Sequence, residues 1–444
     1  MKVLSLLLSL FISLSFNLTV VEKSFAADDI ESEFDDFDKE EEEASSFPIN
    51  GFVDARYGHR LKEVGHNKSF TLGEFRAQSE YQKTFKMVTI KFTGDLVYDA
   101  VNFEDDIDLD RGRGPLDLRE LYFSFSPLSS LDMKVGRQAL TWGTGDMIFI
   151  NDLFPKDWNS FLMGRDLEYL KAPSDAVKFS QFNDFVNIDF VWTPVFDSDR
   201  YVTGNPVSYF SPAKGKIVGA DGPIVPLERS SVGDESEYVL RLSKNLKGYE
   251  YALYGYQGFW KSPEGQNSKG EYYFPKLQVI GASMRGPLLG GIFNFEYGKY
   301  SSTEDHLGTN AYVRNSEQRI LLGYEHEVVK NLTGSLQYYV EAMDNYGEYK
   351  ANQPIGMGVK EESRQMLTVR LTHLSFNQNF TSSLFVFYSP TDKDGSVRPK
   401  VSYKATDKLR YELASNIFFG KEKSSFWGQF QENNNIYVAL RYNY

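Results

Sequence analysis

The sequence predicts an all-β protein: a transmembrane antiparallel up-and-down β-barrel of the outer-membrane type, with about 18 strands and a range of about 16 to 18. Three observations predict this fold. The chain begins with an export signal, it continues in short segments of alternating polarity, and the connections between these segments are alternately short and long.

Residues 1–26 have the composition of a cleaved secretory signal peptide. Lys2 precedes an apolar run, and Ala26 ends a small-residue cleavage site before an acidic stretch. A helical membrane anchor is the alternative. It is disfavoured because polar side chains interrupt the run at Ser5, Ser9, Ser13, Ser15 and Asn17.

Residues 27–47 are dominated by acidic side chains, with "DDIESEFDDFDKEEEEASS" at 28–46. Such a run cannot bury enough apolar surface to fold, so we expect a solvated, disordered leader. A segment that binds a periplasmic partner is the alternative.

The composition excludes several classes of protein. The chain has Cys 0, which removes disulfide scaffolds, thiolate zinc sites and lipoprotein acylation. After residue 26 no stretch approaches the roughly 20 apolar residues of a transmembrane helix. A net charge of -13 argues against nucleic acid as a partner. What remains is an exported all-β protein, either soluble or a barrel in the outer membrane of a Gram-negative bacterium.

Segments of alternating hydrophobicity fill residues 48–444, the predicted barrel domain. We place the strands near 49–58, 69–81, 87–98, 116–126, 133–142, 175–182, 185–193, 236–244, 249–260, 272–284, 291–300, 317–328, 332–343, 363–374, 379–389, 396–405, 409–420 and 435–444.

The connections distinguish a membrane barrel from a soluble sandwich. After even-numbered segments they are short, such as "QKTFK", "NLKG" and "KNLTG". After many odd-numbered ones they are long and polar, as at 143–174 and 197–235. Outer-membrane barrels have short periplasmic turns and long outer loops, whereas a sandwich has no reason to keep this parity.

The two faces of the predicted strands differ in polarity. In "LTGSLQYYVEA", Leu336 and Tyr338 share one face, and Ser335 and Gln337 share the other. The last segment, "NNNIYVALRYNY", alternates in the same way and ends at Tyr444. It resembles the aromatic-terminated last strand of bacterial outer-membrane barrels, and we expect it to close the barrel against the first strand.

If the polar face lines the lumen, basic residues gather there, especially on the last five strands. Charged walls select ions, and a basic wall suits anionic solutes. The alternative is that these are ordinary wall charges paired across strands. The candidate pathway residues are Lys178, Arg241, Arg319, Arg370, Arg398, Lys400, Lys404, Arg410 and Arg441.

Residues 116–175 contain the most distinctive motifs, "LRELY" and "VGRQALTWG". This pair resembles the strand–turn–strand core of porin-like outer-membrane proteins related to the alginate-export family. The resemblance implies transport of a polar or anionic solute and marks Arg119, Gly136, Arg137 and Gln138 as family positions. Because Arg137 and Gln138 are adjacent, one of them must point toward lipid unless a bulge intervenes.

The long connection at 143–174 is rich in aromatic and acidic residues. Two arrangements of this connection stay open. It either folds inward and narrows the pore, where aromatics combined with carboxylates would suit a sugar, or forms an outer cap packed by its own aromatics. The candidate constriction residues are Asp146, Asp152, Asp157, Trp158, Arg165 and Asp166.

No enzyme signature is evident, since the chain lacks G-x-S-x-G and H-E-x-x-H motifs. Asp106, Asp108 and Asp110 have calcium-loop spacing, but Arg111 stands where such a loop needs glycine, so a solvated acidic loop is favoured.

We therefore predict a porin for passive transport of small hydrophilic, anionic or carbohydrate solutes, embedded in membrane lipid, with no cofactor and no metal. A structural or docking barrel for a periplasmic or surface partner, or a surface enzyme, are the alternatives.

Overall fold

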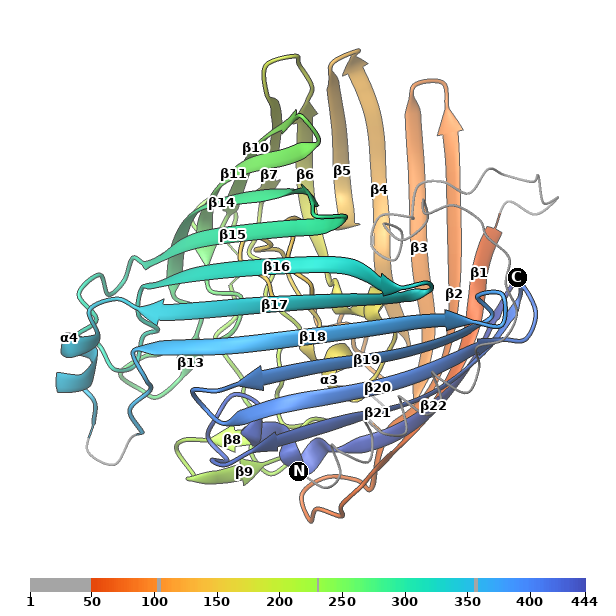
Figure 1. Cartoon of the computed structure of the whole chain (residues 1–444). Coiled ribbons are helices and arrows are strands. Elements are labelled where there is room, and N and C mark those ends of the chain that lie inside the picture. Colours follow the sequence, from red (N-terminus) through yellow and green to blue (C-terminus); the bar gives the residue numbers. More distant parts are fainter. Residues whose placement is uncertain (1–48, 102–104, 230, 355–357) are drawn as a thin grey trace.

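The computed structural model contains one closed antiparallel β-barrel of 18 strands (Figure 1). It describes residues 49–101, 105–229, 231–354 and 358–444. The predicted signal peptide and acidic leader lie outside the described residues. The strand number and the antiparallel topology confirm the predicted fold class.

Each barrel strand pairs with the next one around the wall. The strands are β1 (Ile49–Arg60), β2 (Phe70–Phe85), β3 (Val88–Asp99), β4 (Leu116–Leu128), β5 (Leu131–Ala139), β6 (Pro173–Gln181), β7 (Asn187–Thr193), β10 (Glu237–Leu246), β11 (Tyr249–Phe259), β14 (Lys276–Leu288), β15 (Gly291–Ser302), β16 (Glu317–Val329), β17 (Leu332–Met343), β18 (Ser363–Ser375), β19 (Phe380–Ser389), β20 (Asp394–Lys404), β21 (Leu409–Gly420) and β22 (Asn435–Asn443).

Short elements occur in the loops between these strands. Two small ladders pair β8 (Tyr209–Ser211) with β9 (Lys216–Val218) and β12 (Gly265–Gln266) with β13 (Tyr272–Tyr273). The helices are α3 (Trp158–Met163), η1 (Leu167–Leu170), α4 (Tyr346–Ala351) and η2 (Gly428–Asn433). No helix among the described residues is long and apolar enough to span a bilayer.

The first and last strands close the barrel. β1 pairs with β22 in a register that places Asp54 opposite Arg441. The hydroxyl of Tyr444 donates a hydrogen bond of 2.7 Å to the carbonyl of Gln78 on β2. The predicted role of the terminal strand is thus confirmed.

The connections keep the predicted parity. At one end of the barrel, two-residue turns such as Lys247-Gly248 and Leu289-Gly290 have positive φ at both residues, as type I′ hairpins require. At the other end lie the long loops, with the four-residue link 390–393 as an exception. In outer-membrane barrels the short-turn end is periplasmic and the long-loop end is outside.

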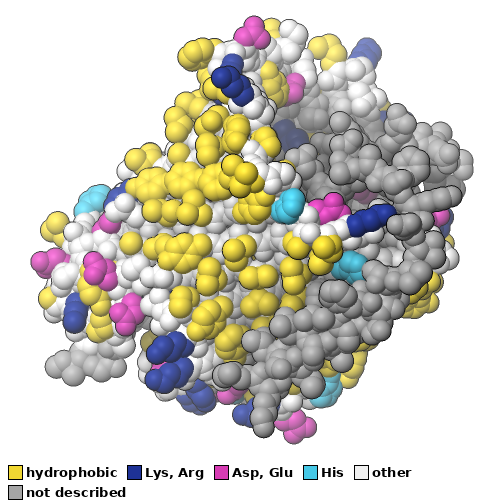
Figure 2. All heavy atoms as spheres, in the orientation of Figure 1, with side chains coloured by type: hydrophobic (Ala, Val, Ile, Leu, Met, Phe, Trp, Pro, Cys, Tyr) yellow, Lys and Arg dark blue, Asp and Glu magenta, His cyan; other side chains and the backbone are white. Residues whose placement is uncertain are grey.

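The outer wall is apolar. On β17 the outward Leu336 is 54% exposed, whereas the inward Gln337 is 3% exposed. Figure 2 shows hydrophobic side chains spread over the visible wall. This alternation confirms the prediction that the outward face of the strands is apolar.

The inward face is less uniformly polar than the alternation predicts. Buried apolar side chains from the wall, including Leu321, Phe387 and Tyr437, form one cluster with Ile150 and Phe161 of the loop between β5 and β6. α3 of that loop lies inside the barrel in Figure 1. The lumen is therefore partly filled by an inward loop with its own apolar core.

Candidate functional site

The loop at 140–172, between β5 and β6, crosses the lumen from one wall to the other. Residues 144–151 contact β15 and β18, and residues 161–171 contact strands on both sides of the β1–β22 seam. The loop starts at the long-loop end, and its Asp166 reaches Arg410, the second residue of β21, near the short-turn end. It therefore descends through much of the lumen.

Glu296 of β15 anchors the first part of this loop. Its carboxylate is fully buried and accepts hydrogen bonds from the backbone N–H of Thr144, Gly145 (2.8 Å) and Asn151 (3.1 Å). The Asn151 side-chain amide donates a further bond of 2.8 Å. Because the donors come from both ends of a short loop segment, one wall residue fixes the whole segment.

Asp146 and Arg370, both predicted site residues, are brought together. Arg370 Nε lies 2.9 Å from Asp146 Oδ2, and Arg370 Nη2 lies 3.0 Å from a carboxylate oxygen of Glu325. This ion pair joins the loop to β18. It places one predicted pathway residue against one predicted constriction residue.

Asp152, Asp157 and Trp158 hold the loop's own shape. Asp152 Oδ1 lies 2.9 Å from Lys156 Nζ, and both side chains are buried. Asp157 accepts a bond of 2.8 Å from the N–H of Ser160 and so caps α3. The indole N–H of Trp158 donates to Asp199 of the next long loop. These predicted residues therefore contact other loop residues, and their polar groups are engaged in those contacts.

Asp166 meets a group of cations from the barrel seam. Its Oδ2 lies 2.8 Å from Arg410, 3.4 Å from Arg441 and 3.6 Å from Arg56. Burial raises the pKa of the Asp166 carboxyl, but the positive charges of Arg441, Lys400, Arg56 and Arg410 outweigh it and hold that pKa well below its usual value. The carboxylate is thus firmly ionised.

Arg165, the neighbouring predicted residue, faces the other side of the seam. Its Nη2 lies 2.6 Å from Glu74 Oε2 on β2 and 3.8 Å from Asp99 on β3. Arg165 and Asp166 therefore use opposite charges to fix adjacent parts of the loop to different strands.

Tyr169 of η1 is a functional residue that the sequence analysis missed. Two guanidinium groups lie over its ring, that of Arg76 at 4.3 Å and that of Arg119 at 4.8 Å from the ring centroid. Its hydroxyl donates to Asp95 at 2.9 Å, and burial raises the pKa of this phenol well above its usual value. Arg119 also donates to the carbonyls of Glu168 and Lys171. Arg119, which the resemblance predicted as a family position, therefore binds the inward loop.

The other family positions shape the rim of β5. Gly136 has φ +126°, and a Cβ there would stand 2.3 Å from the Leu121 carbonyl oxygen. Gln138 is fully buried and donates to the carbonyls of Gly136 and Ala176.

Arg137 shares the outward register of Leu121, yet it does not meet lipid. It is buried beneath the loop at 105–113, where it donates to the carbonyl of Leu109 and to Asp110. Folding of this loop over the rim, rather than a bulge, resolves the conflict between the adjacent polar residues Arg137 and Gln138.

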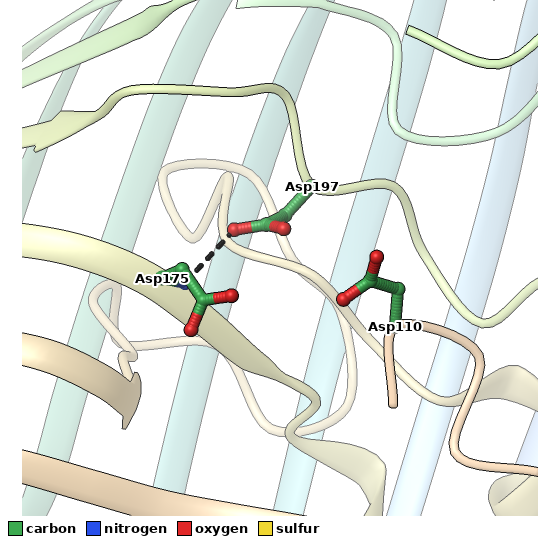
Figure 3. Close-up of side chains that lie close together, drawn as sticks. All are labelled: Asp110, Asp175 and Asp197. Atoms are coloured by element: carbon green, nitrogen blue, oxygen red, sulfur yellow. Dashed lines mark hydrogen bonds between the residues drawn. The ribbon is translucent and has the colours of Figure 1, made fainter. Parts of the chain in front are cut away.

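Three carboxylates gather at this rim, from Asp110, Asp175 and Asp197 (Figure 3). Asp197 Oδ2 accepts a bond of 3.0 Å from the N–H of Asp175. Arg137 binds both Asp110 (2.8 Å) and Asp175 (2.7 Å), so two of the three carboxylates already share one cationic side chain. Burial, with the nearby charge of Glu237, raises the pKa of Asp197 to about 7. We assign no metal to this cluster.

The predicted pathway residues mostly have acidic partners. Lys178 and Arg241 pair with Asp189, Arg319 pairs with Glu317, Lys400 pairs with Glu412, and Lys404 pairs weakly with Asp407. Arg398 instead stacks on Phe161 and donates to its carbonyl oxygen at 3.0 Å. The interpretation as cross-strand pairs thus describes Lys178, Arg241 and Lys400. Arg319 pairs most closely within its own strand and Lys404 with its adjoining turn, whereas Arg370, Arg398, Arg410 and Arg441 bind the inward loop.

Several solved structures share the fold of this chain at low sequence identity. OccAB4 from Acinetobacter baumannii is similar with a TM-score of 0.53 and 10% identity over 89% of this chain and 97% of that one. OccAB3 from the same organism has a TM-score of 0.52 and 10% identity, over 89% of this chain and 98% of that one. A BenF-like porin from Pseudomonas fluorescens Pf-5 has a TM-score of 0.50 and 12% identity, over 89% of this chain and 98% of that one. No curated protein matches the sequence significantly.

The resemblance to the alginate-export family stays a prediction. A family described as "Protein of unknown function (DUF1302)" matches residues 51–359, well over half of the 444 residues. With its porin-like 18-stranded barrel, the chain belongs to the DUF1302 family.

Proposed function

We propose that the protein is a channel in the outer membrane of a Gram-negative bacterium that passes small hydrophilic solutes, preferably anionic ones, with the loop at 140–172 as its constriction. The contacts of Asp166 with the seam support this proposal most directly. They hold a charged loop segment inside the lumen beside several wall cations.

The accessibility of these charges supports a preference for anions. The side chains of Arg410 and Lys400 are 37% and 28% exposed, whereas their acidic partners Asp166 and Glu412 are 16% and 4% exposed. A solute passing the seam therefore meets cations more readily than carboxylates. Lumenal charge of one sign raises the local concentration of the opposite ion.

A carbohydrate solute is the second part of this proposal. Trp158 and Phe149 of the inward loop are only partly buried, and their rings lie 6.1 Å apart. Aromatic faces beside carboxylates and amides offer stacking together with hydrogen bonds, the combination that a sugar requires.

The test is single-channel recording of the purified full-length barrel in a planar bilayer under a KCl gradient. We expect a steady open conductance and a reversal potential of the sign for chloride preference. The double variant K400Q/R410Q should move that potential toward zero, whereas K276Q, at the long-loop end of β14, should leave it unchanged. Absence of channel current at every voltage would overturn the proposal in favour of a plugged or docking barrel.

A further inference from the structure

The outer wall has a groove over β7, β10, β11, β14 and β15, on the side away from the lumen. Its volume is about 390 Å³, and its outward lining includes Tyr238, Leu240, Gly255, Gln257, Gln278 and Ile280. Gly255 forms its floor, because a Cβ added there would meet nothing within 4 Å. The groove exists where a wall of side chains is interrupted by one glycine.

Strand register orders the polarity of this groove along the barrel axis. Tyr238, Gln257 and Gln278 are paired in one row across β10, β11 and β14. The next row toward the short-turn end pairs Leu240 with Gly255 and Ile280. The polar row lies near the long-loop end, since Gln257 stands two residues before the end of β11. The groove is therefore polar at its outer end and apolar toward the membrane centre.

The two carboxamides in the polar row need hydrogen-bond partners. Both side chains are exposed on the outward face, and no hydrogen bond between described residues uses either of them. An amide facing a membrane without a partner is costly. Tyr238 beside them is the second residue of β10, near the long-loop end, and aromatic side chains in such positions of membrane barrels meet the lipid headgroups. The missing partners are therefore polar groups at the level of lipid headgroups.

We propose that this groove binds one membrane lipid of the outer leaflet. An acyl chain lies over Gly255 between Leu240 and Ile280, and the ester or amide linkage of the lipid bonds to Gln257 and Gln278. The lipid has the same order of polarity along the membrane normal as the groove. A flexible acyl chain can follow the floor of the groove over Gly255, whereas the convex wall of a second barrel would rest mainly on its edges, so we commit to a lipid as the occupant.

The test compares lipid binding by the wild type and by a variant with the groove filled. The full-length protein, refolded in detergent without lipid, is titrated with dipalmitoyl phosphatidylethanolamine as a probe for the acyl chain and its ester linkage, and native mass spectrometry follows the first lipid bound. G255L should weaken binding of the first lipid by about tenfold or more, because the leucine side chain occupies the place of the acyl chain. A77L is the matched control: it enlarges another outward residue, on β2 between Val53 and Leu96.

A second variant tests the polar end of the groove. Q257L/Q278L keeps the floor open but removes the carboxamides, and it should also weaken the first lipid step. Folding of every variant is checked by heat-modifiable migration in gels. Equal lipid binding by wild type, G255L and Q257L/Q278L would overturn the proposal. So would loss of a protein dimer on G255L with lipid binding unchanged, because the groove would then be an interface between copies.

Discussion

Glu296 and Asn151 are joined by two hydrogen bonds, from the backbone N–H of Asn151 at 3.1 Å and from its side-chain amide at 2.8 Å, to a carboxylate with no exposed surface. The two residues are 145 positions apart in the chain. This pair ties the inward loop to the wall of β15.

Replacing Glu296 by alanine should release the first part of the loop. Several buried N–H groups lose their acceptor, which costs about 1–3 kcal/mol each when a donor is left unsatisfied. We expect E296A to lower the free energy of unfolding by about 3 kcal/mol in urea titrations in lipid vesicles, and to add current fluctuations in single-channel records. E250A removes an exposed partner of Arg241 and should change stability by less than about 1 kcal/mol. Current fluctuations and a free energy of unfolding equal to those of the wild type would contradict the anchoring role of Glu296.

Replacing Asp166 by asparagine should make the seam more positive. The variant keeps the shape of the side chain but leaves Arg56, Arg410 and Arg441 without their shared carboxylate. We expect the reversal potential under a KCl gradient to move further toward that of chloride. D152N, whose carboxylate pairs with buried Lys156, is the control and should not move it. A shift toward potassium selectivity for D166N would refute the assignment.

The ion pairs of Asp166 with the seam arginines should weaken only at strongly acidic pH. The folded-state pKa of Asp166 is depressed, so its stabilising charge is present above the unfolded value of about 3.9 and is lost as pH falls below it. Proteolysis within 140–172 should therefore be constant from about pH 5 to pH 8 and should rise below about pH 4. In D166N this acid-induced rise should be smaller. The same rise in both proteins would assign it to other carboxylates.

The stability of the loop that contains Asp197 should change at a higher pH than the contact of Asp166. Its folded-state pKa is raised to about 7 by burial and by Glu237, so stability is present at low pH and is lost as pH rises from the usual aspartate value through about 7. Amide hydrogen exchange in 194–236, corrected for its intrinsic pH dependence, should show less protection at pH 8 than at pH 5.5. D197N should abolish the difference, and D184N, in an exposed turn, should retain it. No pH dependence in the wild type would rule out this titration.

Replacing Gly136 by alanine should damage the β4–β5 wall. A residue with a Cβ is strained at φ +126° and would stand 2.3 Å from the carbonyl oxygen of Leu121. We expect a loss of stability of about 2–3 kcal/mol, measured as the urea midpoint of the heat-modifiable band. Gly347 is the matched control, since no atom lies near its added Cβ and its φ is not in the left-handed region. Equal midpoints for G136A and wild type would contradict the backbone requirement.

The alternating pattern of the sequence is not sufficient to predict where each strand begins and ends. The alternation predicts a strand at 272–284, whereas β14 spans Lys276–Leu288, and Tyr272–Tyr273 belongs to the separate ladder with β12. The alternating pattern continues through both elements. Only the pairing of β14 with β11 and β15 determines where the barrel wall begins.

The candidate site shows the same division between local and long-range information. Asp146, Arg370, Asp166, Arg410 and Arg441 were all predictable as polar residues of a loop or an inward face. Their mutual contacts were not, because they join positions more than 200 residues apart in sequence. Glu296 and Tyr169 carry no motif that separates them from other wall and loop residues.

The sequence by itself determined the barrel class, the approximate strand number, the parity of the connections and the polarity of the two faces. These properties follow from periods of two residues and from loop lengths, which are local in the chain. Only the tertiary structure decided that the loop at 140–172 enters the lumen, which carboxylate meets which cation, and that Gly255 opens a groove in the outer wall. Those features depend on barrel closure, which brings strands distant in sequence to fixed positions around one lumen and so defines the contacts available to each side chain.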